Sequence, residues 1–207
     1  MNNLEEHEGV IRFDLQWRQT GPVQADLSAL NAWRGILWKL GLIGQDPRRY
    51  DGAGFGNVSL RRGSGQQFII SGSQTGHLAL VDERHYALVT DFDPGANRVV
   101  SEGPVRPSSE SMTHGVIYRL DDSVNCILHV HSPDIWNAAS ALALPMTHSD
   151  VAYGTPEMAA EVGRLFGETD VGQRGIFAMA GHLDGVVAFG PTPEAAGVSL
   201  IKALARS

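Results

Sequence analysis

The chain has 207 residues, of which 43% are hydrophobic, and its net charge at neutral pH is −7. That length and apolar content predict one domain spanning residues 1–207 with a sizeable buried core. The acidic balance argues against a nucleic-acid partner, which would require clustered Lys and Arg. No stretch approaches the roughly 20 apolar residues that cross a bilayer, so we expect no membrane partner.

The N-terminus and the single cysteine indicate the compartment. Residues 1–8 are acidic and lack an apolar core, so they are not expected to form a secretory signal. Cys126 is the only cysteine, which excludes an intrachain disulfide and fits a reducing environment. We therefore expect a cytoplasmic protein.

The first half of the chain predicts a strand, a helix and a hairpin. Residues 10–17 alternate between apolar and polar side chains and predict a half-buried strand. After a glycine-rich turn at 51–56, two strand-like runs at 57–61 and 67–71 are separated by a hairpin signal. Between the first strand and that turn lies an amphipathic helix, whose predicted apolar face comprises Leu27, Leu30, Trp33, Ile36, Leu37 and Leu40.

The second half alternates strands with helices that begin in one way. Further strands are expected at 87–92, near Val99-Val100, at 126–131, at 175–180 and at 186–189. A hydroxyl residue opens each helix, often with proline next, at Ser108 or Ser109, Ser132-Pro133, Thr155-Pro156 and Thr192-Pro193. The pattern predicts an α/β fold: a three-layer αβα sandwich around a mixed, largely antiparallel sheet.

Two histidines stand two residues apart in the apolar run at 126–131. Side chains at i and i+2 of a strand point to the same face, so His129 and His131 can reach one metal ion. The same spacing also fits a polar patch or a half-buried pair. The pair is therefore a candidate metal site whose support must come from elsewhere in the chain.

A second candidate lies at the helix start Pro107-Ser108-Ser109-Glu110. Free backbone N–H groups and the helix dipole favour anions at such a position. Ser108 and Ser109 could hold a substrate anion while Glu110 moves a proton at a metal site. Alternatively, the segment is an ordinary helix cap with Glu110 as a favourable acid in the first turn.

A third candidate is His182, in the turn 181–185 between two predicted strands. As a third ligand beside His129 and His131, it would complete a three-histidine site with an open position, which is typical of catalytic zinc. A single histidine in a turn is otherwise a solvent-facing residue. The spacing alone leaves both interpretations open.

Two glycine- and hydroxyl-rich stretches, at 54–59 and 71–76, could offer backbone amides to a phosphate. They could equally be plain turns, and neither matches a nucleotide P-loop or a dinucleotide fingerprint. The spacing assigns no role to the remaining histidines, which are His7, His77, His85, His114 and His148.

Taken in order, these segments resemble the class II aldolase/adducin family. Gly56-Asn57-Val58-Ser59 is similar to the early G-N-[VI]-S motif of that family, and Thr75-Gly76 to the end of its [ST]-P-[ST]-G loop. Pro107-Ser108-Ser109-Glu110 matches the S-S-E motif, and His129-Val130-His131 the H-x-H motif. His182 takes the place of the later family histidine, and the resemblance covers residues 27–205.

The resemblance implies an αβα fold of the class II aldolase type, often assembled as a homotetramer. By analogy, His129, His131 and His182 would bind Zn²⁺ or another divalent ion such as Mn²⁺, Fe²⁺ or Co²⁺. Glu110 would be the acid/base residue. The substrate's phosphate or an equivalent anion would be held by Gly56, Asn57, Thr75, Gly76, Ser108 and Ser109.

The activity that the resemblance implies is reversible aldol cleavage of a ketose phosphate or similar hydroxy-ketone through a metal-stabilised enediolate. The partner would then be a small sugar-phosphate-like molecule. Relatives with the same site epimerise pentulose phosphates or dehydrate a sugar phosphate, and adducin-like modules are not enzymes. These alternatives stay open on the sequence.

Overall fold

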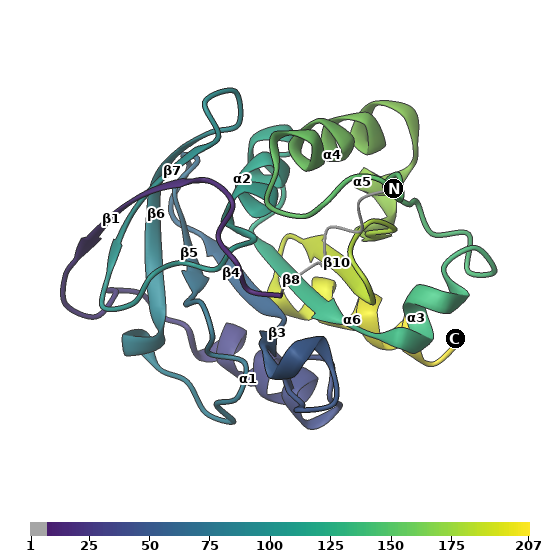
Figure 1. Cartoon of the computed structure of the whole chain (residues 1–207), viewed down its shortest axis with the longest axis horizontal. Helices are drawn as coiled ribbons and strands as arrows, with labels where there is room; N and C mark the ends of the chain where they lie inside the picture. Colours follow the sequence, from purple (N-terminus) through teal and green to yellow (C-terminus); the bar gives the residue numbers. More distant parts are fainter. Residues whose placement is uncertain (1–7) are drawn as a thin grey trace.

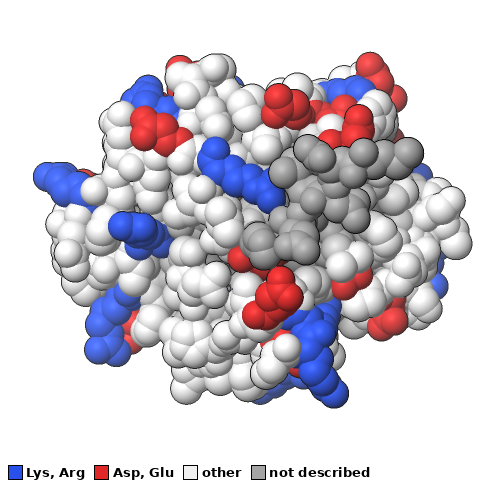
Figure 2. Space-filling view, viewed as in Figure 1, with Lys and Arg blue, Asp and Glu red and all other residues white. Residues whose placement is uncertain are grey.

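The computed structural model describes residues 8–207. The predictions made for residues 1–7, including any role of His7, lie outside the described part of the chain. Among the described residues, no helix is both long and apolar enough to cross a membrane. On the face drawn in Figure 2, the described Lys and Arg side chains are scattered and interspersed with acidic ones, without a continuous basic patch.

An eight-stranded sheet forms the middle layer, in the order β1-β7-β6-β5-β4-β8-β10-β9 (Figure 1). Among the strands of residues 8–207, the edge pair β1·β7 is parallel and the other pairs of this sheet are antiparallel, which confirms the predicted mixed, largely antiparallel sheet. The strands are β1 (Asp14–Gln19), β4 (Asn57–Arg61), β5 (Phe68–Ser71), β6 (Tyr86–Asp93), β7 (Arg98–Gly103), β8 (Cys126–His131), β9 (Ile176–Ala178) and β10 (Gly185–Gly190). A separate two-stranded ladder joins β2 (Gly44–Gln45) to β3 (Gly54–Phe55).

Helices cover both faces of the sheet, which confirms the three layers (Figure 1). One face packs on α2 (Ser111–Leu120), α4 (Pro156–Glu168) and α5 (Val171–Arg174). The other packs on α1 (Ser28–Lys39), α3 (Pro133–Ala138) and α6 (Pro193–Leu204). Two 3-10 turns, η1 (Tyr50–Gly52) and η2 (Glu83–His85), lie in the connections.

Three of the four predicted helix starts are confirmed by their capping hydrogen bonds. Ser132 Oγ accepts from the backbone N–H of Ile135 at 3.2 Å, and Pro133 occupies the first helical turn of α3. The hydroxyls of Thr155 and Thr192 cap α4 and α6 in the same way, each followed by a proline. These caps satisfy N–H groups that the helix cannot pair internally.

Two strand boundaries, the start of α2 and the buried face of α1 differ from the sequence-based expectation. The predicted strand at 10–17 begins only at Asp14, because the backbone groups of Val10 and Arg12 bond to the side chains of Tyr153 and Asn97 instead of to a strand. The predicted strand at 175–180 shortens to β9. On α1, Ile36 and Leu40 are exposed by 41% and 48%, so the buried face is narrower than predicted.

Candidate metal centre

The two histidines of β8 lie side by side in the middle of the sheet. Antiparallel pairing places His129 opposite Asn57 of β4 on one side and Val187 of β10 on the other. Both imidazoles are fully buried, and the Nε2 atoms of His129 and His131 are 3.2 Å apart. The strand therefore presents both rings to one point, as the i, i+2 spacing predicts.

His182 joins this pair from the turn between β9 and β10. Its ring centroid lies 5.2 Å from that of His129 and 4.7 Å from that of His131. The side chain is 1% exposed, so the interpretation of His182 as a solvent-facing residue is wrong. Gly181 permits the approach, since a Cβ at that position would lie 2.1 Å from the carbonyl oxygen of Val151.

The three histidines could hold a metal ion. One ring nitrogen from each of His129, His131 and His182 lies within 4.8 Å of the others. Three imidazoles suit zinc and several other divalent ions. The fit is supported by Glu110, whose carboxylate is buried beside the cluster with its Oε2 atom lacking a hydrogen-bond partner among the described residues. A cation would balance that buried charge.

Glu110 is positioned by the start of α2. The helix begins at Ser111, slightly later than predicted, and Glu110 is its N-cap residue. Its side chain makes no capping hydrogen bond, so Glu110 does not itself cap the helix. Instead Oε1 lies 3.2 Å from Nδ1 of His182, with the glutamate only 1% exposed. The carboxylate therefore faces the three histidines.

The charge states follow from burial and from neighbouring carboxylates. Burial lowers the pKa of His129 and His131, which keeps both imidazoles neutral and able to ligate a metal. Burial also disfavours the charged form of His182, but the carboxylates of Glu110 and Glu8 outweigh it and raise its pKa. Burial alone would raise the pKa of Glu110, yet the surrounding imidazoles hold it below its usual value, so Glu110 is a carboxylate.

Beside the cluster lies a small hollow that we call the glycine-hydroxyl hollow. Backbone contacts shape it: Ser108 N–H donates to the carbonyl of Ser71, and Thr75 Oγ1 donates to the carbonyl of Gly72. All six residues predicted to hold the substrate anion line this hollow, together with Glu8 and Gly9 from the N-terminal segment. They are Gly56, Asn57, Thr75, Gly76, Ser108 and Ser109.

Comparison with known proteins assigns the family. Residues 46–203 match the sequence profile of the class II aldolase and adducin N-terminal domain. The chain belongs to the class II aldolase and adducin family. This confirms the resemblance, and the α/β fold agrees with it.

Solved structures of class II aldolases share this fold. An L-fuculose 1-phosphate aldolase superimposes with a TM-score of 0.64 at 20% identity, over 89% of this chain and 86% of that one. The L-fuculose-1-phosphate aldolase of Thermus thermophilus gives 0.59 at 21% identity, over 87% and 89% of the two chains. At these identities the likeness concerns the fold alone.

A shorter sequence match points to another member of the family. Methylthioribulose-1-phosphate dehydratase of Stenotrophomonas maltophilia is 37% identical over 79 residues, which is 38% of this chain. The match spans 33% of the relative, so the chain matches about a third of the length of this curated protein.

Two tyrosines of this chain, to which the sequence assigned no role, lie against the three histidines. The Tyr50 ring meets His131 at 4.7 Å, and its hydroxyl donates to Asp184 Oδ2 at 2.6 Å. The Tyr153 ring lies 4.5 Å from that of His182. Neither tyrosine stands in a motif or at a ligand spacing, so no local signal predicts either contact.

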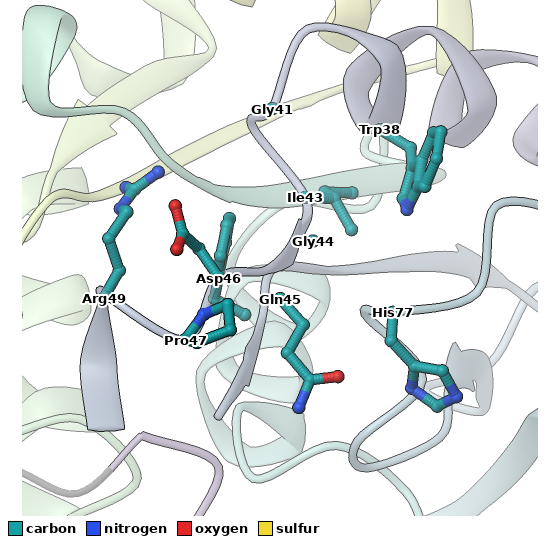
Figure 3. A pocket seen from close by; sticks show the side chains of 10 residues that line it. Trp38, Gly41, Ile43, Gly44, Gln45, Asp46, Pro47, Arg49 and His77 are labelled. Carbon is teal, nitrogen blue, oxygen red and sulfur yellow. The ribbon is translucent and has the colours of Figure 1, made fainter. Parts of the chain in front are cut away.

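A larger cavity of about 580 Å³ has Phe55 in its lining, and Figure 3 shows other residues that line it. Asp46, Pro47 and Arg49 line one side, and Trp38 and His77 lie opposite. The Phe55 ring belongs to the lining of this cavity and lies 5.6 Å from that of His131. The cavity contains none of the predicted site residues.

His114 lies near the cluster of this class II aldolase/adducin domain. Its ring is fully buried, and Nδ1 lies 2.7 Å from Ser59 Oγ, which also contacts the hydroxyl of Tyr118 at 2.7 Å. Burial, opposed by the charge of Glu110, lowers its pKa to about 3. His114 is therefore a neutral, packed residue beside Glu110.

Proposed function

We propose that this chain is a divalent-metal-dependent lyase that reversibly cleaves a ketose phosphate or similar hydroxy-ketone. The convergence of His129, His131 and His182 on one buried point, with the carboxylate of Glu110 beside them, carries this proposal. The adjoining glycine-hydroxyl hollow and the membership of the class II aldolase and adducin family support it.

The residues divide the chemistry between holding the substrate and moving a proton. A bound divalent ion would supply a Lewis acid that polarises the substrate carbonyl. The hydroxyls of Ser108 and Ser109 and the amides of the hollow would hold an anionic group. Glu110, ionised and buried, would accept or return a proton at the carbon or hydroxyl next to that carbonyl. Oε1 of Glu110 lies against Nδ1 of His182, which leaves Oε2 without a neighbouring donor in the described part of the chain.

A dehydratase is the second candidate. The 37% identity over 79 residues to a methylthioribulose-1-phosphate dehydratase favours it. The same histidines and Glu110 would serve this reaction, because removing water beside a carbonyl also requires a polarised oxygen and a mobile proton. An epimerase acting on a pentulose phosphate would use the same groups.

We also propose the finer properties that the family resemblance implies. These are Zn²⁺ as the native ion, one domain across residues 1–207, a homotetramer, and a cytoplasmic location. Metal analysis of the purified protein identifies the ion, and light scattering coupled to size-exclusion chromatography gives the oligomeric state.

The central experiment measures metal content and products together. Purified wild-type protein should carry one divalent ion per chain, and His129→Ala should lose it. His148→Ala is the control, since that imidazole is exposed. With L-fuculose 1-phosphate, methylthioribulose 1-phosphate and pentulose phosphates as substrates, cleaved fragments identify an aldolase, loss of water a dehydratase, and an inverted centre an epimerase.

Glu110→Gln completes that experiment. The variant should keep its metal and lose about 100-fold or more in turnover, because positioned acid/base groups typically contribute that much. Wild-type protein without metal, or full turnover in Glu110→Gln, would contradict the proposal.

A further inference from the structure

Glu8 reaches the candidate metal centre from the N-terminal segment. Its Oε2 atom lies 2.8 Å from Nε2 of His182 and 3.6 Å from Nε2 of His131. The carboxylate is buried at 7% exposure, although it is 174 residues away from His182 in sequence. It contacts the ring nitrogen of His182 opposite the one that faces Glu110.

These separations match those between ligands of one metal ion. In a tetrahedral zinc site with bonds of 2.0–2.2 Å to nitrogen and oxygen, neighbouring ligand atoms are roughly 3.3 Å apart. The Nε2 atoms of His129 and His131 are 3.2 Å apart. The two distances from Glu8 fall on either side of that value. The glutamate oxygen therefore lies at ligand spacing from two of the three histidines, His131 and His182.

The segment that carries Glu8 is fitted to its place. Gly9 has φ of 76°, and a Cβ there would lie 2.2 Å from the side-chain amide nitrogen of Gln74. The backbone N–H and carbonyl of Val10 both bond to the Tyr153 hydroxyl, at 3.1 and 3.3 Å. The carbonyl of Arg12 accepts from the Asn97 amide at 2.9 Å. These contacts hold residues 8–12 against the site.

The same segment fills the glycine-hydroxyl hollow. Glu8 and Gly9 form part of its lining, and the free space that remains is about 10 Å³. One water molecule needs about 10–15 Å³ by the same kind of measure, so a phosphate group does not fit. With Glu8 in place, the residues expected to hold the substrate anion are covered.

We propose that Glu8 is a fourth, exchangeable ligand of the metal, and that residues 8–12 close the site until a substrate displaces them. This inference rests on the proposed metal-dependent function. The segment completes the coordination of the ion in the resting enzyme and shields it from competing small ligands. The oxygens of a hydroxy-ketone phosphate would replace the Glu8 carboxylate, while the phosphate takes the space vacated by Glu8 and Gly9.

The test uses metal binding in place of turnover. Zn²⁺ affinity is measured by competition with a chromophoric chelator for the wild type, Glu8→Gln, Glu8→Ala and Glu83→Gln, the last a matched control at an exposed glutamate. Visible spectra of the Co²⁺-loaded proteins report the ligand set. Glu8→Gln and Glu8→Ala should bind Zn²⁺ at least about tenfold more weakly, since even outer partners of metal ligands contribute that much. Their Co²⁺ spectra should differ from the wild type, and that of Glu83→Gln should not.

Inorganic phosphate tests the closure. It should bind more tightly to metal-loaded Glu8→Ala than to the wild type, because the hollow is then open. Unchanged Zn²⁺ affinity and Co²⁺ spectra in both Glu8 variants would overturn the inference and leave the proposed function intact, provided that His129→Ala loses its metal. Equal phosphate affinity in Glu8→Ala and the wild type would overturn the closure. A wild-type protein that binds no metal would overturn both the inference and the proposed function.

Discussion

Asn57 and His129 face each other across the β4·β8 ladder, which fixes the start of the glycine-hydroxyl hollow against a candidate metal ligand. Gly56, just before Asn57, makes this contact possible. Its φ is 77°, and a Cβ there would lie 2.7 Å from Cγ1 of Ile43 and 3.2 Å from the carbonyl oxygen of His129.

Gly56→Ala should therefore destabilise the protein and weaken metal binding. The left-handed backbone costs about 1–2 kcal/mol for alanine, and overpacking adds about 1–3 kcal/mol. Urea unfolding measures the loss. Gly63→Ala is the matched control, because Gly63 has φ of 67° with no atom within 4 Å of its Cβ position. It should lose only the backbone contribution and keep its metal affinity. Equal losses in both variants would refute the contact argument.

Arg34 should hold in place the loop at 75–78, which contributes Thr75 and Gly76 to the glycine-hydroxyl hollow. Its guanidinium is 2% exposed and donates to the carbonyls of Leu78 at 2.8 Å and Thr75 at 2.9 Å. In Arg34→Met both carbonyls lose these donors, which should cost about 3 kcal/mol in unfolding free energy. KM for a phosphorylated substrate should rise more than kcat falls. Arg62→Met, at an exposed position, should leave both quantities unchanged. Wild-type stability and KM in Arg34→Met would contradict this role.

His114 predicts an acid-sensitive stability. Burial lowers its pKa to about 3 in the folded protein, whereas an unfolded histidine has a pKa of about 6.5. Below pH 6.5 the unfolded chain therefore binds one more proton at this site, and stability falls with falling pH down to the folded-state pKa. Between pH 7 and pH 5 this one group lowers the free energy of unfolding by about 2 kcal/mol.

His114→Gln should reduce the stability difference between pH 7 and pH 5 by that amount, as measured by urea unfolding at both pH values. The control is His77→Gln, which alters an exposed imidazole and should leave the difference as in the wild type. An unchanged pH dependence in His114→Gln would show that this ring does not carry the effect.

Tyr50 should fix the turn that carries His182. Tyr50→Phe keeps the ring beside His131 but removes the hydroxyl that bonds Asp184 at 2.6 Å. Losing a hydrogen bond to a charged group costs about 1.5–3 kcal/mol, and a looser turn should lower Zn²⁺ affinity about tenfold. Tyr86→Phe is the control. The Tyr86 hydroxyl bonds Asn31, and the residue belongs to the core between the sheet and helices α1, α3 and α6. That variant should lose stability but not metal affinity, so equal metal affinity in the two variants would contradict the role of Tyr50.

Local patterns were sufficient for much of the fold. Strand-like and apolar runs bounded by turns predicted most strands, and hydroxyl-proline pairs predicted three helix starts, because both depend on neighbours in sequence. The expected strand before Asp14 was wrong for the opposite reason. The backbone of Val10 bonds to Tyr153, 143 residues away, and such a partner leaves no trace in the local pattern.

In the candidate site, too, features that depend on sequence neighbours were predicted and features that depend on distant partners were not. The convergence of His129 and His131 followed from strand geometry. That of Glu110 and His182 was one of two open interpretations of their positions, and the ordered motifs of the family favoured it. Glu8 and Tyr50 were not expected, because their partners His182 and Asp184 are 174 and 134 residues away. Which of these residues bind metal or substrate stays a prediction.

The place of β8 between β4 and β10 has a consequence for how the site opens. Strands paired on both sides are typically among the last parts of a protein to exchange their amide hydrogens, whereas turns open far more readily. His129 and His131 belong to the first kind of structure, and His182 and Glu8 to the second. Hydrogen exchange should therefore be slow at the amides around His129 and His131. It should be much faster around His182 and Glu8, because that part of the site opens and closes many times before the molecule unfolds.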